Sequence, residues 1–421
     1  MTTPLTTMLP NGVRVVIDPM PGLLSAAIGV YFRAGTIDET REENGVAHLL
    51  EHMAFKGTRR RSARDIAEEI EAVGGYLNAS TGYTRTGYYA RILSGDAGVA
   101  FDILGDIVTE PLFDPGELEK EREVVIQEIG EAADQPDDVV MELLQTLSFG
   151  DHPLGRPILG TEESVTAQQP GSLRAFMACR YSPENLIVAA SGGVDPDAIA
   201  ALVSERFASR QASGAAPARK APRYVGGRAH DNRDIEQTHI ALAFPGAAVT
   251  DADYFATRLF VEALGGGMSS RIFQSVREDR GLAYSVYSFL DAYEDIGTVG
   301  VYVGTEAANA AEAVALIRRD IEALAASPTA KEIDRARAML KSTLLMGLES
   351  PATRSEAAVS QLFAHGRLVP PVELSDRLDA VTIEDVRAVA AKALSGTASS
   401  LSVVGPAKFD SLVKALDGGG I

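Results

Sequence analysis

The chain has 421 residues, of which 46 % are hydrophobic and 23 % are charged, and this composition is typical of a globular protein with more than one domain. Its formal net charge of −19 argues against nucleic acid as a partner, because phosphate backbones are bound by Lys and Arg. An acidic surface would attract basic peptides, although high net charge can also serve solubility alone.

The single cysteine, Cys179, excludes an internal disulfide framework and suits a reducing compartment. The first residues lack the basic segment and long apolar run that are typical of a signal peptide, and no span of about 18 apolar residues occurs elsewhere. We therefore expect a soluble, cytoplasmic protein with no membrane partner.

The first informative segment is "GVAHLLEHMAFKGT", residues 45–58. Its spacing predicts a helix with Asn44 as a candidate N-cap. His48 and His52 stand four residues apart and so share a helix face, with Glu51 on nearly the same side. Two neutral imidazoles at this spacing suit zinc, and a neighbouring carboxylate can accept a proton from a zinc-bound water. The order H-x-x-E-H is that of an inverted zinc-peptidase motif, although so short a pattern also arises by chance.

A third ligand is expected on the next long helix, "FDPGELEKEREVVIQEIGEAADQPDD", for which Asp114 is the predicted N-cap. Glu121 and Glu128 are two turns apart on one face, together with the apolar Val124 and Val125. That face is expected to point inward, where an unpaired carboxylate would be costly. For either glutamate alone, a solvated helix charge is the alternative, and composition does not choose between them.

The two halves of the chain resemble each other in pattern. The strand-to-helix run "GYYARILSGDAGVAFDILGDIV" has a counterpart in "GTVGVYVGTEAANAAEAVALIRRDI", the helical run "DPGELEKEREVVIQEI" in "TAKEIDRARAMLKSTLL", and the strand "SAAIGVYFRAG" in "THIALAFPGA". We therefore predict an α+β fold with two similar domains, each a mainly antiparallel sheet with helices on one face. The predicted boundaries are residues 1–212 and 229–421, joined by a Pro-, Gly- and Ala-rich linker at 213–228.

These residues together resemble the pitrilysin-type zinc peptidases, and most closely the half-length branch that includes the mitochondrial processing peptidase. That family combines H-x-x-E-H with a distant helical glutamate in a pattern similar to "EREVVIQEI". The resemblance implies that zinc is bound by His48, His52 and Glu128. It also implies that Glu51 is the general base and that Glu121 is a supporting catalytic residue.

The segment "GGYLNAST" is similar to the edge strand with which family members pair the substrate backbone. The resemblance therefore places Asn78 and Ala79 beside the scissile bond. The next residues, "TGYTRTGYY", depart from the family pattern, because Gly82 and Thr84 stand where a polar–acidic pair is expected. That departure puts the usual subsite shape in doubt but does not affect the metal ligands.

In the second half, "VREDRGLAYSV" resembles an Arg–Tyr element of the family. The resemblance implies that Arg277 and Tyr284 hold the substrate or stabilise the oxyanion.

The resemblance implies a zinc-dependent endopeptidase that cleaves unfolded peptides or precursor segments, and basic peptides are candidate substrates. In half-length members two subunits close like a clam around a chamber, and this chain holds both elements of the site, so a homodimer is expected. The alternative is a non-catalytic peptide-binding or scaffold subunit of a processing-peptidase-like complex. The intact set of His48, Glu51, His52 and Glu128 argues against that alternative.

Overall fold

The computed structural model describes residues 4–211, 216–395 and 399–418. Its helices and strands belong to two compact units. Unit 1 comprises Met1–Gly130, Arg156–Lys220 and Met346–Leu368, and unit 2 comprises Glu131–Gly155, Ala221–Leu345 and Val369–Ile421.

Unit 1 is built on a six-stranded sheet with the order β1-β2-β6-β3-β5-β4. Its strands are β1 (Leu5–Met8), β2 (Arg14–Pro19), β3 (Ser25–Phe32), β4 (Tyr76–Thr81), β5 (Thr86–Leu93) and β6 (Leu186–Gly192). Its helices are α1 (Val46–Ala54), α2 (Ala63–Ala72), α3 (Ala97–Thr109), α4 (Pro115–Ala133), α6 (Glu162–Ala167), α7 (Pro170–Arg180), α8 (Pro196–Phe207) and α12 (Pro351–His365), of which α4 ends in the first residues of unit 2.

Unit 2 is built on a five-stranded sheet with the order β7-β11-β8-β10-β9. Its strands are β7 (Gly227–Asp231), β8 (Thr238–Gly246), β9 (Ala283–Ala292), β10 (Gly297–Thr305) and β11 (Ser400–Val404). Its helices are α5 (Pro136–Phe149), α9 (Tyr254–Gly265), the π-helical η5 (Phe273–Glu278), α10 (Ala310–Ala326), α11 (Ala330–Gly347), α13 (Pro371–Ala380), α14 (Ile383–Ser395) and α15 (Phe409–Leu416). Short 3₁₀ helices are η1 (Thr36–Asp38), η2 (Ser94–Asp96), η3 (Pro153–Gly155) and η4 (Pro183–Asn185).

The two sheets repeat one topology. Each has one parallel pair, β2–β6 in unit 1 and β7–β11 in unit 2, and its other pairs are antiparallel. The runs that match in sequence occupy matching places: β3 and β8 lie beside the parallel pair, and the chain then continues through β5 and α3 or through β10 and α10. The predicted pair of similar α+β domains with mainly antiparallel sheets is therefore confirmed.

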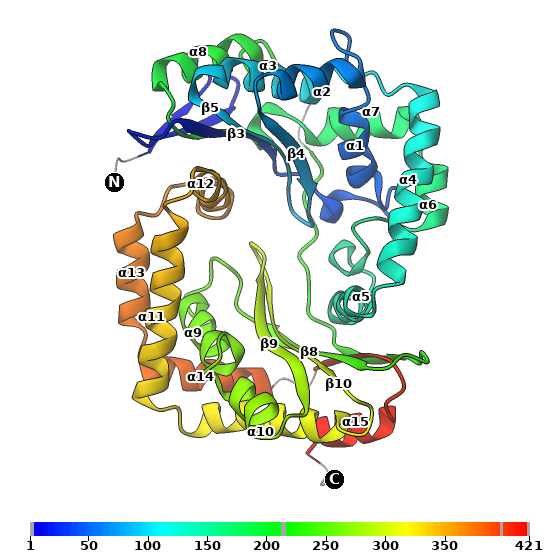
Figure 1. The fold of residues 1–421 in the computed structure, drawn as a ribbon, viewed down its shortest axis with the longest axis vertical. Coiled ribbons are helices and arrows are strands. Elements are labelled where there is room, and N and C mark those ends of the chain that lie inside the picture. The colour runs from blue at the N-terminus through cyan, green and yellow to red at the C-terminus, as the bar shows by residue number, and fades with distance from the viewer. Residues whose placement is uncertain (1–3, 212–215, 396–398, 419–421) are drawn as a thin grey trace. The chain divides into compact units, whose positions relative to one another are not determined.

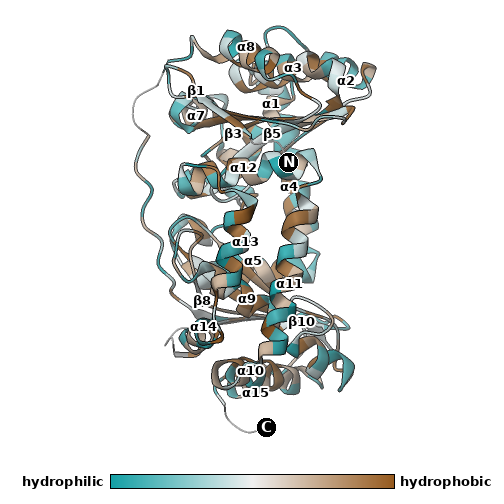
Figure 2. Cartoon of the chain, turned by 90° about the vertical axis from the view of Figure 1, so that its left-hand side faces the viewer, coloured by the Kyte–Doolittle hydropathy of each residue, from teal (hydrophilic) through white to brown (hydrophobic). Residues whose placement is uncertain are grey.

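The prediction placed helices on one face of each sheet. It was incomplete, because one further helix packs on the second face of each sheet. In unit 1, α12 contributes Val359 to a cluster with Val16 and Tyr31, whereas neighbouring strand residues face the main core. Figures 1 and 2 show α3 and α8 on one side of β3 and β5 and α12 on the other side. In unit 2, α5 has the corresponding place against β8 and β11.

Each helix on a second face comes from the half of the chain that forms most of the other unit. The segment with α5 comes from the first half and packs within unit 2, and the segment with α12 comes from the second half and packs within unit 1. The predicted domains 1–212 and 229–421 are continuous in sequence, and they stay a prediction about where the two halves of the repeat begin and end. Residues 213–215 of the predicted linker lie outside the described residues.

In the described ranges, no helix combines the length and the apolar character needed to cross a membrane.

Candidate metal centre

Helix α1 carries the two histidines, and its start is held by the carboxylate of Glu39, which lies shortly before the helix in the chain. The N-cap is Gly45, at φ +88°, and not the predicted Asn44. Glu39 accepts hydrogen bonds from the backbone nitrogens of Gly45 (2.9 Å) and Ala47 (2.8 Å) and from Asn44 Nδ2 (3.1 Å). Asn44 thus supports the cap without forming it, because its side chain binds Glu39 and the Pro157 carbonyl.

The apolar face of α1 decides where its polar residues point. Six residues of the helix are buried in the unit 1 core: Val46, Ala47, Leu49, Leu50, Met53 and Ala54. The remaining face presents His48, Glu51 and His52, all of intermediate exposure. The helical period therefore places the three titratable side chains together at the edge of the core.

The side chains of His48, His52 and Glu128 converge. Each offers one ligand atom, and these atoms all lie within 4.8 Å of one another. The Oε2 atom of Glu128 is 3.8 Å from His48 Nε2 and 3.6 Å from His52 Nε2. The structure thus brings together the three residues for which zinc ligation was predicted.

Helix α4 supplies the carboxylate from a well-defined start. Asp114 Oδ1 accepts hydrogen bonds from the backbone nitrogens of Gly116 (2.8 Å) and Glu117 (3.0 Å), which confirms the predicted N-cap. Val125 is fully buried, as expected, but Val124 is 38 % exposed, so the prediction that both valines point inward is wrong for Val124. The inward stripe of α4 is narrower than the sequence suggested.

His52 lies between two glutamates of α4. Its Nδ1 is 3.1 Å from Glu121 Oε2, and its Nε2 faces Glu128. Glu121 is 5 % exposed, and its other oxygen is 2.7 Å from Lys56 Nζ. Such a carboxylate fixes the tautomer and orientation of an imidazole, so that its other nitrogen is free to bind a metal. The sequence analysis did not identify Lys56.

Glu51 is connected to the edge strand of the sheet. Thr81 Oγ1 donates a 2.5 Å hydrogen bond to Glu51 Oε2, and Thr81 is the last residue of β4. Burial raises the pKa of Glu51, and the Thr81 hydrogen bond opposes that shift. Thr81 was not predicted as a site residue, although it ends the segment "GGYLNAST" that was predicted to bind substrate.

The chemistry of this donor set fits zinc. Burial, with a smaller contribution from His52, lowers the pKa of His48 to about 4, so its imidazole is neutral and can bind a cation at neutral pH. Two imidazole nitrogens and one carboxylate oxygen form a three-ligand set of the kind that leaves a fourth position for water.

The predicted substrate residues lie on β4, at the edge of the sheet. In the described part of the chain β4 pairs with β5 alone, so its other edge is open. Asn78 is exposed and Ala79 is buried. Gly82 and Thr84 lie in the turn between the strands, where the Gly82 nitrogen donates to the Arg85 carbonyl at 2.9 Å.

Arg277 and Tyr284 lie together in unit 2. Arg277 Nη1 donates to the Tyr284 carbonyl at 2.8 Å, and its guanidinium stands 4.8 Å from the centre of the Tyr284 ring. The same guanidinium stands 4.7 Å from the centre of the Phe273 ring, and Tyr284 is 81 % exposed. The structure thus forms the predicted Arg–Tyr element, and its approach to a metal site stays a prediction.

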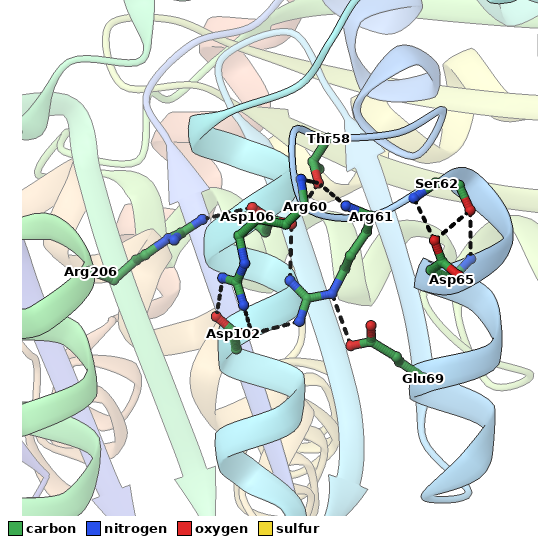
Figure 3. A network of polar contacts seen from close by, with 9 residues as sticks. All are labelled: Thr58, Arg60, Arg61, Ser62, Asp65, Glu69, Asp102, Asp106 and Arg206. Atoms are coloured by element: carbon green, nitrogen blue, oxygen red, sulfur yellow. Dashed lines mark hydrogen bonds and ion pairs between the residues drawn. The ribbon is translucent and has the colours of Figure 1, made fainter.

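A buried ionic network holds the segment that follows α1 (Figure 3). Asp106 of α3 is fully buried and accepts hydrogen bonds from Thr58 Oγ1 (2.6 Å), Arg61 Nη1 (2.9 Å) and Arg206 Nη2 (3.1 Å). Arg61 also binds Asp102 Oδ2 at 2.6 Å. The network ties the exit of the histidine helix to α3 and α8, and the sequence analysis did not find it.

Comparison with known proteins defines the class to which this fold and donor set belong. Residues 14–162 match insulinase (peptidase family M16), and residues 169–340 match the peptidase M16 inactive domain. The first match contains all three converging residues. The second contains Arg277 and Tyr284, and none of the three converging residues lies within it.

The chain is similar over nearly its whole length to proteins named as uncharacterized zinc proteases. The relative from Streptomyces coelicolor is 39 % identical over 96 % of this chain and 89 % of its own length. The Bacillus subtilis relative is 38 % identical over 90 % of this chain and 93 % of its own length. The chain therefore belongs to peptidase family M16, as one of its half-length members, and zinc is its cofactor.

Solved structures share the fold. A structure described as a peptidase M16 inactive domain from Pseudomonas fluorescens has a TM-score of 0.89 at 23 % identity and covers 97 % of this chain and 99 % of its own. A protease from Helicobacter pylori has a TM-score of 0.89 at 21 % identity and covers 96 % of this chain and 99 % of its own.

Proposed function

We propose that the protein is a zinc-dependent endopeptidase that cleaves unfolded peptides or precursor segments. The observation that carries the proposal is the convergence of His48, His52 and Glu128, with Glu51 on the same helix face as the histidines. The relatives named as zinc proteases support the same reaction class.

The proposed mechanism assigns a separate task to each polar residue. When bound, zinc would act as a Lewis acid that polarises the peptide carbonyl and lowers the pKa of a water molecule. Glu51 accepts a proton from that water and later transfers it to the leaving amine nitrogen. Thr81 holds the Glu51 carboxylate through their 2.5 Å hydrogen bond, and Glu121 orients the His52 ring.

The open edge of β4 provides the place for substrate. An extended peptide can add to such an edge through its backbone, which brings its peptide bonds past Asn78 and Ala79. Thr81 ends the same strand and binds Glu51, so a peptide on β4 passes beside the proposed base. A folded substrate would have to unfold locally before its backbone could pair in this way.

Arg277 and Tyr284 are proposed to act on the substrate as well. The Tyr284 hydroxyl would donate to the developing oxyanion, and Arg277 would hold the tyrosine through the contacts described above. We further propose a clam-like homodimer in the cytoplasm, in which each subunit contributes one Arg–Tyr element and one metal centre. The net charge of −19 would favour basic peptides as substrates.

The test compares the wild-type protein with Glu51→Gln. The wild type is expected to carry about one zinc per chain and to cleave a flexible fluorogenic peptide, and the variant should keep the zinc but lose at least about 10³-fold of the rate. Glu71→Gln, at an exposed position of α2, is the matched control and should be unaffected. Cleavage by Glu51→Gln at the wild-type rate would refute the assigned base. A zinc-free, inactive wild type would instead favour the scaffold alternative.

A further inference from the structure

A cavity of about 230 Å³ lies on the second face of the unit 1 sheet, between its strands and helix α12. Residues of β3, β4, β5 and α12 line it, among them Tyr31, Ser80, Tyr89, Arg91 and Glu356. All of these residues belong to unit 1. Neither the metal centre nor the proposed catalytic residues use this cavity, although Ser80 belongs to the edge strand β4.

The alternation of β4 connects the cavity with the metal centre. Successive side chains of a strand point to opposite faces. Ala79 packs in the main core and Thr81 binds Glu51, whereas Ser80, between them, lines the cavity on the second face. A peptide added along β4 would alternate in the same way, and every second side chain would point toward the face that carries the cavity.

Two glycines allow the floor of this cavity to form. A Cβ atom at Gly29 would lie 2.4 Å from the Tyr31 ring, and one at Gly87 would lie 2.6 Å from it. The tyrosine ring therefore lies flat across two adjacent strands, where any side chain would displace it. The Tyr31 hydroxyl is hydrogen-bonded to Glu356, which fixes the ring against α12.

The charged residues that line the cavity differ in whether they already have an ion-pair partner. Glu356 is the acidic residue of the lining, and it already binds Arg85 at 2.5 Å and the Tyr31 hydroxyl. Arg91 is an exposed residue of β5 and belongs to none of the ion pairs among the described residues, whereas Arg85 is the cation that pairs with Glu356. The hydroxyl of Tyr89, a half-buried residue of β5, can donate a hydrogen bond. The lining groups that have no ion-pair partner are therefore mainly hydrogen-bond donors, and one of them, the Arg91 guanidinium, carries a full positive charge.

We propose that this cavity is a specificity pocket for an acidic side chain, Asp or Glu, of the bound peptide. Arg91 would pair with the carboxylate, and the hydroxyls of Ser80 and Tyr89 would complete its hydrogen bonds. The inference rests on the proposed peptide binding along β4, and it concerns one side chain of a peptide that is otherwise neutral or basic.

The test measures binding separately from cleavage. Three fluorescent ten-residue peptides, identical except for a central Glu, Gln or Lys, are titrated into full-length protein that carries Glu51→Gln and cannot cleave them. The Glu peptide is expected to bind about 10-fold more tightly than the Gln peptide, as one charge-assisted hydrogen-bonded pair would provide. Adding Arg91→Glu should abolish that preference and favour the Lys peptide, and adding Arg91→Gln should abolish it without reversal.

Arg64→Glu, which makes the same charge change at an exposed position of α2, should leave the preference unchanged. Equal affinities for the Glu and Gln peptides, or an unchanged preference in the Arg91→Glu protein, would overturn the inference. Cleavage of the three peptides by protein with Glu51 intact is measured in parallel. Failure to cleave with the Glu preference present would refute the proposed reaction and leave the pocket standing.

Discussion

Units 1 and 2 share a sheet topology, but the described residues contain one triplet that could hold a metal ion, and it lies in unit 1. The counterpart of α1 in chain order is α9, which follows β8 as α1 follows β3. Helix α9 has the sequence "YFATRLFVEALG", with most of its residues buried and no histidine. The shared topology therefore comes from apolar packing, and the proposed metal site depends on a few polar side chains in one of the two units.

The same contrast appears on the helices that follow the edge hairpins. Asp106 on α3 and Asp320 on α10 are both buried aspartates in matching elements. Asp106 is paired with the guanidinium groups of Arg61 and Arg206. Burial raises the pKa of Asp320, whose hydrogen-bond partner is the Ser275 hydroxyl. The buried acid thus has two guanidinium partners in unit 1, whereas in unit 2 it has a hydroxyl partner and the more exposed guanidinium of Arg319 at 3.8 Å.

The largest expected effect comes from breaking the metal triplet. His48→Ala should reduce bound zinc from about one per chain to near zero and peptide cleavage by about 10³-fold or more, because two ligands do not hold zinc. His239→Ala, in unit 2, should keep both, since His239 binds the Tyr302 hydroxyl at 2.8 Å. Elemental analysis and a peptide assay measure the two quantities. Full zinc occupancy in His48→Ala would contradict the assigned ligands.

The next effect concerns stability. Asp106→Asn should lower the free energy of unfolding by about 3 kcal/mol, because Arg206 would lose its counter-charge and Arg61 would keep only Asp102 and Glu69. Asp320→Asn should cost about 1 kcal/mol or less, since an amide can keep the hydrogen bond to Ser275. The chain has no tryptophan, so urea denaturation is followed by circular dichroism. Equal losses in the two variants would remove the proposed difference between the units.

A smaller effect is expected at Glu121, which is proposed to orient His52. Glu121→Ala should weaken zinc binding by about 10- to 100-fold, as is usual when a partner of a metal-bound histidine is removed. Glu123→Ala, on an exposed position of the same helix, should have no effect. Titration with a competing chelator gives both affinities. If Glu121→Ala binds zinc as the control does, the carboxylate does not position the ring.

The smallest effect is a pH dependence at the start of α1. Burial raises the pKa of Glu39 from 4.5 to about 8. Between these values the folded protein holds a proton that the unfolded chain releases, so this contribution to stability is complete below pH 4.5 and is lost as the pH rises through about 8.

Glu39→Gln does not titrate and provides the reference for that effect. The stability of the wild type relative to the variant should fall by about 1 kcal/mol between pH 6 and pH 7. Urea denaturation in the presence of a chelator measures this difference without contributions from metal binding. A difference that stays constant with pH would show that the carboxyl group of Glu39 does not titrate in this range.

Much of the fold followed from periodicity and repetition. The strands β3 and β8 and the helices α4 and α11 were predicted as matching pairs, and Asp114 was predicted to cap α4. The exchange of α5 and α12 was not predicted, because strands with apolar residues on both faces do not say which helix covers the second face. Glu39, Lys56 and Thr81 were missed for a related reason, since each acts on a residue that local patterns do not connect to it.

The sequence by itself determined that His48, Glu51 and His52 share one helix face, because that follows from the period of the helix. Residue type and helical period left Glu121 and Glu128 equivalent on a second helix, and the family resemblance assigned the metal to Glu128. Only the packing of α4 against α1 decided that Glu128 meets both imidazole Nε2 atoms and that Glu121 meets Nδ1 of His52. The two carboxylates are chemically alike, so tertiary distance, and not residue type, separates the proposed metal ligand from the group proposed to orient one.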